Sequence, residues 1–338
     1  MKKKIAKFFK SIVLKKKRNL IERILVLIVF RYEKLKNILS ENNSKTASKM
    51  YYQILNLERN IIGGKYSFVS VNELLIWTTE WIKSFPTTYD VVVGIPRSGL
   101  LVANMVALKL GKPLTTPELF EQSLYWESKL INKKGDYKNI LLIDDSITNG
   151  TAMEESFNFL CSSRENLNIT KAVLIATEDS KHLVDIYYKI IPNPRIFEWN
   201  LVHSKKGKFA TDLDGVICEN CPPGVDSNEE LYVKWIKNAK PYLLPTFEID
   251  VIVSNRLEKY RFGTEKWLAK YGICYKKLIL WNIESKQKRY GKYAQRKIEL
   301  LLKIKPSIFW ESSFGEAKKI WKVTKIPTLC IDEMVLFN

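Results

Sequence analysis

A regular alternation of short apolar runs with helical patterns is the feature that most constrains the fold of this 338-residue chain. In the first half, apolar runs at residues 90–94, 139–143 and 172–176 predict buried strands. Helical patterns follow two of these runs, at residues 100–110 and 152–160. Strands that alternate with helices predict βαβ units, and therefore an α/β domain with a parallel sheet flanked by helices. Ligands of such sheets bind at the carboxyl ends of the strands.

A second unit of the same kind begins near Lys208. Its predicted strands lie at residues 209–212, 250–253, 278–281, 307–310 and 328–331, and its predicted helices at 263–271 and 295–302. Residues 192–206 read as the join between the two units. A chain of this length suggests two domains and an extra segment, at roughly 150 residues per domain. The predicted division is a basic helical segment, 1–65, followed by two α/β domains, 66–205 and 206–338.

The loop after the second apolar run combines two acids with a small, polar helix start. The run ends at Asp144 and Asp145, and residues 146–151 read Ser-Ile-Thr-Asn-Gly-Thr. Backbone N–H groups at a helix start bind phosphate, and Thr148 and Thr151 add hydroxyl donors. Adjacent carboxylates would repel a phosphate unless they hold hydroxyl groups of the same ligand or its magnesium ion. A phosphorylated sugar fits this pattern better than the alternative, an acidic helix cap.

A second loop, at residues 93–99, also follows a predicted strand. Gly94 and Gly99 allow the backbone to approach a ligand closely, and Arg97 can bridge pyrophosphate oxygens through two parallel hydrogen bonds. The two loops together resemble the phosphoribosyl-pyrophosphate loops of type I phosphoribosyltransferases. The lysine-containing segment 115–138 is either a lid over such a site or a plain surface loop.

That resemblance implies a role for each loop residue. Asp144 and Asp145 would hold the ribose hydroxyls while magnesium pyrophosphate leaves the anomeric carbon, with no covalent enzyme intermediate. The implied substrate-binding residues are Arg97, Ser98 and Gly99 for pyrophosphate, with Ser146, Thr148, Asn149, Gly150 and Thr151 around the 5-phosphate. The implied fold of the first domain is the type I phosphoribosyltransferase fold.

Two carboxylates two residues apart, Asp212 and Asp214, follow the first strand of the second unit. One can attack phosphorus while the other protonates the leaving oxygen, and magnesium shields their charge. A calcium-binding loop is the alternative, but the further Asp or Asn ligands that it needs are absent from this stretch. The pattern resembles the first motif of haloacid-dehalogenase-like (HAD-like) phosphatases, which implies a Rossmannoid fold for this domain.

The later motifs of the HAD-like family are placed by the same resemblance. Ser254 would contact the transferred phosphate, and Glu311 would supply a metal carboxylate. Lys297 is the implied phosphatase lysine, with Lys292 and Lys286 as rivals. The implied catalytic residues are therefore Asp212, Asp214, Ser254 and Lys297, and the implied Mg²⁺ ligands are Asp212, Asp214 and Glu311.

Two details of the second unit depart from what the family or a metal site needs. Ser312 and Ser313 stand where the HAD-like family often has a further Asp. Cys218 and Cys221 form a single CxxC pair, which supplies only half of the ligands of a structural zinc site. Plain loop thiols are the favoured interpretation, and the odd total of five cysteines indicates a reducing compartment. Neither histidine of the chain is assigned chemistry.

Charge is concentrated at the start of the chain. The net charge is +19, and residues 1–40 hold thirteen basic and two acidic residues. Apolar residues repeat at helical spacing between the lysines, which predicts a basic amphipathic helix on an anionic membrane surface. Docking on the protein itself or on a second copy is the alternative. No run reaches the ~18 apolar residues of a membrane span, and a signal peptide is rejected because no small-residue cleavage site follows.

The two units together resemble the dual-domain ribofuranosyltransferases of bacterial surface-polysaccharide assembly. The implied function is transfer of 5-phosphoribose from phosphoribosyl pyrophosphate to a lipid-linked glycan acceptor, followed by removal of the 5-phosphate. The implied location is cytoplasmic, peripheral on the inner face of the cytoplasmic membrane. The alternatives are a nucleobase phosphoribosyltransferase fused to a nucleotidase, and a non-catalytic regulator. Nucleic acid is the least favoured partner, and the oligomeric state, a homo-oligomer included, stays open.

Overall fold

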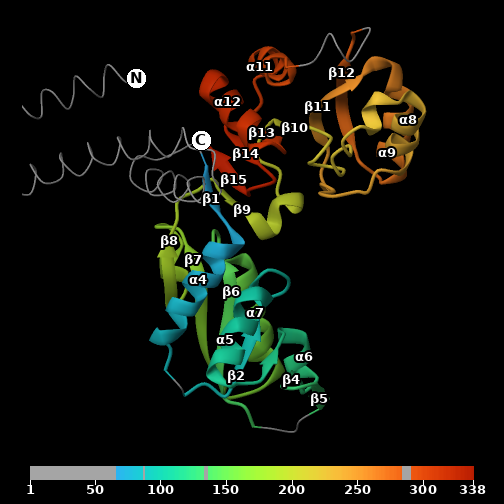
Figure 1. The fold of residues 1–338 in the computed structure, drawn as a ribbon. Helices are drawn as coiled ribbons and strands as arrows, with labels where there is room; N and C mark the ends of the chain where they lie inside the picture. Colours follow the sequence, from blue (N-terminus) through green and yellow to red (C-terminus); the bar gives the residue numbers. More distant parts are fainter. Residues whose placement is uncertain (1–65, 87, 133–135, 284–290) are drawn as a thin grey trace, which may run out of the picture. The chain divides into compact units, whose positions relative to one another are not determined.

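The computed structural model describes residues 66–86, 88–132, 136–283 and 291–338. The basic segment 1–65, with its predicted membrane helix, and the rival lysine Lys286 lie outside the described residues. Within those residues, no helix combines the length and the apolar character needed to cross a membrane. The described chain is α/β, as predicted, with two large sheets whose strands are mostly parallel (Figure 1).

The first large sheet has seven strands in the order β5-β4-β3-β2-β6-β7-β8. Its centre consists of the three predicted strands, which pair in parallel: β2 (Val91–Gly94), β6 (Asn139–Ser146) and β7 (Asn168–Ala176). The two predicted helices are α5 (Gly99–Leu110) and α7 (Thr151–Ser163). The predicted strand–helix alternation of this half is therefore confirmed.

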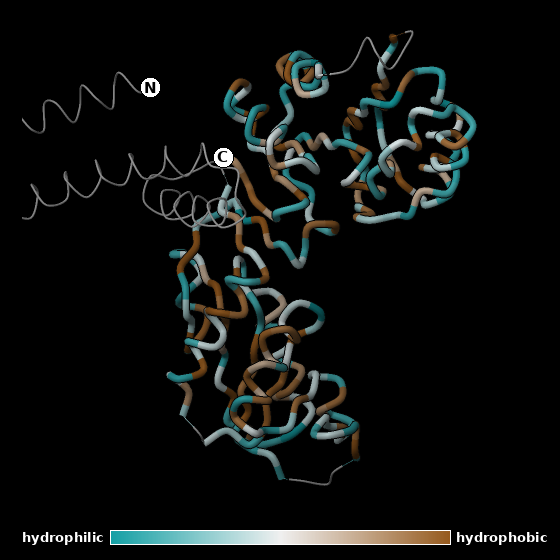
Figure 2. The backbone as a smooth tube through the Cα atoms, in the orientation of Figure 1, coloured by the Kyte–Doolittle hydropathy of each residue, from teal (hydrophilic) through white to brown (hydrophobic). Residues whose placement is uncertain are grey.

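Side-chain alternation along the central strands fills both faces of this sheet. Val92 packs in one core cluster with residues of α4 (Val71–Trp81) and α5, whereas Val91 packs in another with residues of α6 (Pro117–Glu121) and α7. Both valines are fully buried. Successive residues of a strand point to opposite faces, so an all-apolar strand needs cover on both sides. Figure 2 shows hydrophobic residues concentrated along these strands.

Within the described part of the segment 115–138, residues 124–132 continue the sheet. After α6, β4 (Leu124–Trp126) and β5 (Leu130–Asn132) form an antiparallel pair that extends the sheet from β3 (Leu114–Thr115). At the other edge, β8 (Ile186–Ile190) pairs in parallel with β7. Of the two alternatives for segment 115–138, the plain surface loop does not describe residues 124–132, because strands β4 and β5 there are paired in a ladder.

The predicted join has a structure of its own. Strand β9 (Arg195–Phe197) pairs in parallel with β1 (Ser67–Val69), at the start of the first domain. The 3₁₀ helix η3 (Glu198–His203) follows directly. Residues 192–206 are thus tied by strand pairing to the beginning of the first domain, and they do not form a free linker.

The second large sheet has six strands in the order β12-β11-β10-β13-β14-β15. The five predicted strands are present as β10 (Phe209–Thr211), β11 (Ile249–Leu257), β12 (Tyr275–Trp281), β13 (Ile308–Glu311) and β14 (Thr328–Cys330), all parallel. An antiparallel edge strand, β15 (Val335–Phe337), is the addition that the sequence did not predict. The helices are α8 (Glu229–Asn238), α9 (Arg261–Lys270), α11 (Tyr293–Ile304) and α12 (Phe314–Thr324).

Candidate active sites

The first acid pair lies at the carboxyl end of β6, in the middle of the first sheet. Asp145 is only 5% exposed, and its Oδ2 accepts a hydrogen bond of 2.8 Å from Nε1 of Trp199. Burial raises the pKa of Asp144, and the negative charge of Asp145 raises it further. Burial also raises the pKa of Asp145, although hydrogen bonds with Asp144 and Trp199 oppose the rise. A crowded pair of this kind is stabilised by a cation or by donated hydroxyl groups.

The predicted pyrophosphate loop lies beside this acid pair, because β2 and β6 are neighbours in the sheet. Gly99, the first residue of α5, packs so closely that a Cβ atom there would lie 2.8 Å from Oδ1 of Asp144. Ser98 Oγ accepts a hydrogen bond of 2.8 Å from Nδ2 of Asn200, and the side chain of Arg97 is exposed. The structure therefore brings the two predicted loops to one edge of the sheet.

Residues 146–151 form the turn between β6 and α7. Gly150 is the N-cap of α7 and has a φ of 79°, a left-handed conformation that glycine adopts without steric cost. Asn149 Oδ1 accepts a hydrogen bond from the backbone N–H of Thr151, and Thr148 is exposed. The turn leads into a helix of 13 residues. Its first-turn N–H groups and the positive end of its dipole suit a phosphate group.

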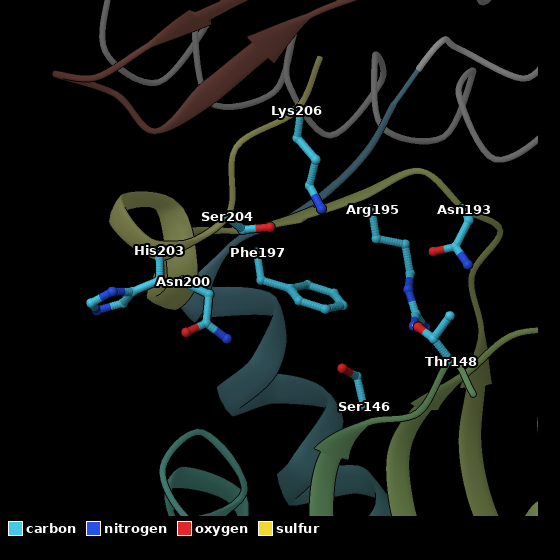
Figure 3. A pocket seen from close by; sticks show the side chains of 9 residues that line it. All are labelled: Ser146, Thr148, Asn193, Arg195, Phe197, Asn200, His203, Ser204 and Lys206. Atoms are coloured by element: carbon cyan, nitrogen blue, oxygen red, sulfur yellow. The ribbon is translucent and has the colours of Figure 1, made fainter. Parts of the chain in front are cut away.

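A cavity of about 310 Å³ opens beside this turn (Figure 3). Two of its lining residues, Ser146 and Thr148, belong to the predicted phosphate loop. The others come from residues 193–206, which the sequence identifies only as a join: Asn193, Arg195, Phe197, Asn200, His203, Ser204 and Lys206. His203 is thus in the wall of a cavity, although its sequence context gave it no role.

Strand β9 and η3 hold these unpredicted side chains in place. Arg195 Nη2 donates hydrogen bonds to the backbone oxygen of Ile147 at 2.8 Å and to Oγ1 of Thr148 at 2.5 Å. The rings of Phe197 and Trp199 are stacked, with centroids 4.8 Å apart and planes 9° apart. Residues two apart in a strand point to the same side. The spacing of Arg195 and Phe197 was therefore a signal in the sequence, but this stretch has no continuous apolar run, so its strand was not recognised.

The second cluster is centred on Lys297, which is 2% exposed and lies on α11. Its Nζ lies 2.6 Å from Oδ2 of Asp212, 2.7 Å from Oε2 of Glu311 and 3.1 Å from Oε2 of Glu316. The rival Lys292 is exposed, at the N-cap of the same helix. Of Lys297 and Lys292, the two candidate lysines among the described residues, Lys297 is the one whose side chain contacts Asp212.

Burial dominates the electrostatics of this cluster. It raises the pKa of Glu311 to about 8; Lys297 opposes the rise, and the negative charges of Asp212 and Glu316 add to it. Burial likewise raises the pKa of Asp212 against the effect of Lys297. The three carboxylates together outweigh the burial of Lys297 and raise its pKa well above the usual value. Three carboxylates facing one ammonium leave an excess of two negative charges when all are ionised.

Glu316 is the functional candidate that the sequence analysis missed in this domain. It stands in the first turn of α12, where Ser313 is the N-cap. Glu316 lies one helical turn after residues 312–313, where the HAD-like resemblance implies a further acid. It was missed in the sequence because only residues at the end of the strand were considered. Among the described residues, no three His, Cys, Asp or Glu side chains are arranged as a ready metal site.

Asp214 lines the same cavity of about 330 Å³ as Asp212, but its carboxylate has different partners. Arg256, which is fully buried, donates from Nη2 to Oδ1 of Asp214 at 2.6 Å and from Nε at 3.0 Å. The thiol of Cys218 lies 3.3 Å from the same oxygen. The predicted ligands Asp212, Asp214 and Glu311 therefore all line one cavity, but Asp212 and Glu311 contact Lys297 whereas Asp214 contacts Arg256.

The remaining predicted residue, Ser254, is also in place near this cavity. It lies on β11, next in the sheet to β10, and is fully buried. Its Oγ accepts a hydrogen bond of 3.2 Å from the backbone N–H of Arg256.

The two cysteines of the CxxC pair differ in their surroundings. Cys218 is buried, whereas Cys221 is half-buried, and burial raises the pKa of the Cys221 thiol to about 11.

Comparison with known proteins finds a similarity for the first domain. Residues 67–205 match the phosphoribosyl transferase domain family. A curated relative, the transcriptional regulator GfcR of Methanocaldococcus jannaschii, is 32% identical over 88 residues. That match covers 22% of this chain, and the chain spans only 38% of the length of the relative.

Two solved structures are similar to part of the chain. The xanthine-guanine-hypoxanthine phosphoribosyltransferase of Helicobacter pylori shares 17% identity over 40% of this chain and 93% of that chain, with a TM-score of 0.33. A purine phosphoribosyltransferase from Pyrococcus horikoshii shares 16% identity over 40% and 94%, with a TM-score of 0.32. The stretch that matches the phosphoribosyl transferase domain family, residues 67–205, carries the acid pair and both glycine-containing loops.

Proposed function

We propose that this chain transfers 5-phosphoribose from phosphoribosyl pyrophosphate to a glycan acceptor and then removes the 5-phosphate, which leaves a ribofuranosyl residue in a surface polysaccharide. One observation carries the proposal. A phosphoribosyl transferase domain is joined in one chain to a second α/β unit that contains the buried cluster of Asp212, Lys297 and Glu311. Carboxylates and an ammonium at a strand end suit phosphate removal, the reaction that a phosphoribosylated product would require.

In the first step, an acceptor hydroxyl oxygen bonds to the anomeric carbon, and the bond from that carbon to pyrophosphate breaks. The hydroxyl proton is lost to solvent or to a nearby base. Asp144 and Asp145 hold the ribose hydroxyls, and the first turn of α7 holds the 5-phosphate. Arg97 and Ser98 hold the departing pyrophosphate. The protein contributes position and charge to this displacement and forms no covalent intermediate.

In the second step, a carboxylate oxygen of Asp212 attacks phosphorus and the bond to the ribose 5-oxygen breaks. Asp214, positioned by Arg256, accepts a proton from solvent and passes it to that oxygen. Water then attacks phosphorus in the aspartyl phosphate, which releases inorganic phosphate and restores Asp212. Ser254 and Lys297 hold the phosphoryl oxygens during both displacements.

The residues of the second cluster fit a magnesium ion. Their donors are carboxylate oxygens, which Mg²⁺ prefers, and the excess of two negative charges matches one divalent cation. Asp212 and Glu311 would hold the ion, and Glu316 would support its charge from α12. When bound, Mg²⁺ neutralises the phosphate oxygens that the nucleophile must approach.

The acceptor is proposed to be a lipid-linked glycan at the inner face of the cytoplasmic membrane. The support is the concentration of thirteen basic residues within residues 1–40, since each such residue near anionic headgroups contributes about 1 kcal/mol. We expect the full chain to sediment with vesicles that contain phosphatidylglycerol and not with phosphatidylcholine vesicles. Replacement of the lysines at 2–4, 7 and 15–17 by glutamine should abolish sedimentation, and unchanged binding would contradict the membrane role.

The two active sites are tested by one pair of variants. With phosphoribosyl pyrophosphate, Mg²⁺ and a panel of lipid-linked glycans, Asp145→Ala should stop pyrophosphate release. Asp212→Asn should permit it and accumulate a product that still carries the 5-phosphate, visible by mass spectrometry. If Asp212→Asn leaves phosphate removal intact, the phosphatase assignment is wrong. If nucleobases and not glycans trigger pyrophosphate release, the acceptor assignment is wrong and the fused nucleotidase alternative stands.

A regulator without turnover is the second candidate, because the curated relative is named a transcriptional regulator. In that case the full chain would bind duplex DNA, with an affinity that changes when phosphoribosyl pyrophosphate is added. It would release no pyrophosphate with any acceptor. The acids Asp144, Asp145, Asp212 and Asp214 favour the enzyme, since sensing a ligand does not require the phosphatase cluster.

A further inference from the structure

The charged residues that line the cavity beside the phosphate loop are all positive. Its nine lining residues include two cations, Arg195 and Lys206, and no acid. Figure 3 shows both side chains directed into the cavity from different segments, Arg195 from β9 and Lys206 from the chain after η3. Among the described residues, Lys206 has no ion pair with a carboxylate. An excess of cations in a confined space favours an anionic occupant.

The guanidinium of Arg195 adds a second, independent observation. Arg195 is 5% exposed, and its Nη1 is a buried donor without a partner among the described residues. An unsatisfied buried donor of a charged group is costly, so native structures rarely retain one without a function. Burial lowers the pKa of Arg195 to about 10 and also lowers the pKa of Lys206, with the charge of Arg195 contributing. An oxyanion between the two cations would satisfy the donor and relieve the repulsion.

The cavity adjoins the 5-phosphate loop through Ser146 and Thr148, but both cations come from residues outside that loop. The 5-phosphate already has the first turn of α7 as its proposed donor set. Arg195 uses Nη2 to hold that loop, through Thr148, and leaves Nη1 for a different group. Lys206 lies outside the loop altogether. The cavity volume of about 310 Å³ has room for a sugar unit next to the ribose.

We propose that this cavity is the acceptor subsite and that it takes a glycan whose terminal sugar carries an oxyanion, a carboxylate or a phosphate. Arg195 and Lys206 bind the oxyanion, and the amides of Asn193 and Asn200 bind neighbouring hydroxyl groups. The inference rests on the proposed first step, since it names the acceptor of that reaction. It predicts that the enzyme selects acidic over neutral acceptors of the same ring structure.

The test compares matched acceptors with the full chain. Calorimetry first measures binding of phosphoribosyl pyrophosphate with Mg²⁺. Pyrophosphate release is then measured with methyl glucuronide, methyl galacturonide and methyl glucoside 6-phosphate against methyl glucoside and methyl galactoside. We expect at least one acidic acceptor to exceed its neutral partner about tenfold in kcat/KM, the scale of one charge-assisted hydrogen bond. Lys206→Gln should remove that preference and leave the affinity for phosphoribosyl pyrophosphate within twofold.

The control is Lys109→Gln, which removes the same charge from an exposed position in the last turn of α5. It should retain the preference. Equal use of acidic and neutral acceptors, or neither binding nor turnover of any acidic one, overturns the inference. So does a Lys206→Gln chain that loses affinity for phosphoribosyl pyrophosphate and keeps its acceptor preference, because the cations then serve that substrate. Failure of phosphoribosyl pyrophosphate to bind the unaltered chain would instead overturn the proposed function.

Discussion

Trp199 links an aromatic stack to the first acid pair. Its indole Nε1 donates to Asp145, and its ring stacks on Phe197. The next residue, Asn200, donates to Ser98 in the other predicted loop. Two consecutive residues of η3 therefore hold one polar group in each half of the proposed phosphoribosyl-pyrophosphate site. We infer that Trp199 is a positioning residue, which orients Asp145 for the ribose hydroxyls.

Replacing Trp199 by phenylalanine tests this role, because the variant keeps an aromatic ring and loses the N–H donor. The kcat/KM for pyrophosphate release should fall about tenfold, the scale of a hydrogen bond to a charged group. The bond from Trp199 lowers the pKa of Asp145, so its loss should move the acid limb of the pH profile to higher pH. Hydrolysis of p-nitrophenyl phosphate by the second site should be unchanged. A pH profile that does not move would leave Trp199 a packing residue only.

Glu311 gives a prediction about pH and magnesium. In the folded chain it keeps its proton up to about pH 8, whereas its ordinary pKa is 4.5. The folded chain therefore binds more protons than the unfolded chain between these values, and stability falls as pH rises through the window. Mg²⁺ competes with that proton and neutralises the ionised cluster. The rise in Tm produced by Mg²⁺ should thus be larger at pH 8 than at pH 6.

Calorimetric melting at the two pH values measures this effect, with about 2–4 °C expected for each kcal/mol of binding. Glu311→Gln should remove both the magnesium effect and its pH dependence. The matched control is Glu299→Gln, on the exposed side of α11, which should retain both. An equal rise in Tm at pH 6 and pH 8 in the unaltered chain would contradict the proposed titration of Glu311.

At the scale of elements, the central parallel strands of both large sheets could be predicted from the sequence, whereas β1, β9 and β15 could not. β2, β6 and β7 are buried on both faces, so their apolar runs are continuous and visible. β1 and β9 have three residues each and pair with each other, although they lie far apart in the chain; β15, also of three residues, pairs with its neighbour β14. The acid pairs at the ends of predicted strands could therefore be found, whereas Arg195 and Phe197 on β9 could not.

The close contact between α5 and β6 predicts the effect of a substitution at Gly99, the first residue of α5. An alanine at Gly99 would place its Cβ 2.8 Å from Oδ1 of Asp144 and 3.0 Å from its Cα, so the helix or the carboxylate must shift. A displacement of this size misaligns a reacting group, and Gly99→Ala should lower pyrophosphate release by about tenfold or more. Gly315→Ala, in α12 with no atom within 4 Å of the new Cβ, is the matched control. Full activity of Gly99→Ala would show that this close approach has no role in the reaction.

At the scale of the whole molecule, the two proposed sites are built from separate stretches of the chain. The first is built from residues between Arg97 and Lys206, and the second from residues between Asp212 and Glu316. The division into two α/β units was visible from the alternation of strands and helices. The proposed chemistry of the acceptor could not be predicted from the sequence. It depends on side chains that the pairing of β1 with β9 brings to the phosphate loop.

This separation predicts that two inactive chains should complement each other in solution. Asp145→Ala lacks the first step and keeps the second site, whereas Asp212→Asn keeps the first and lacks the second. A mixture should therefore form the dephosphorylated ribofuranosyl product, with a lag, because the phosphoribosylated intermediate must leave one chain and bind another. Mass spectrometry over time would follow both species, and the double variant mixed with wild-type protein serves as the dilution control. If the intermediate accumulates and is never dephosphorylated in the mixture, release between the sites does not occur and the two steps must be completed within one chain.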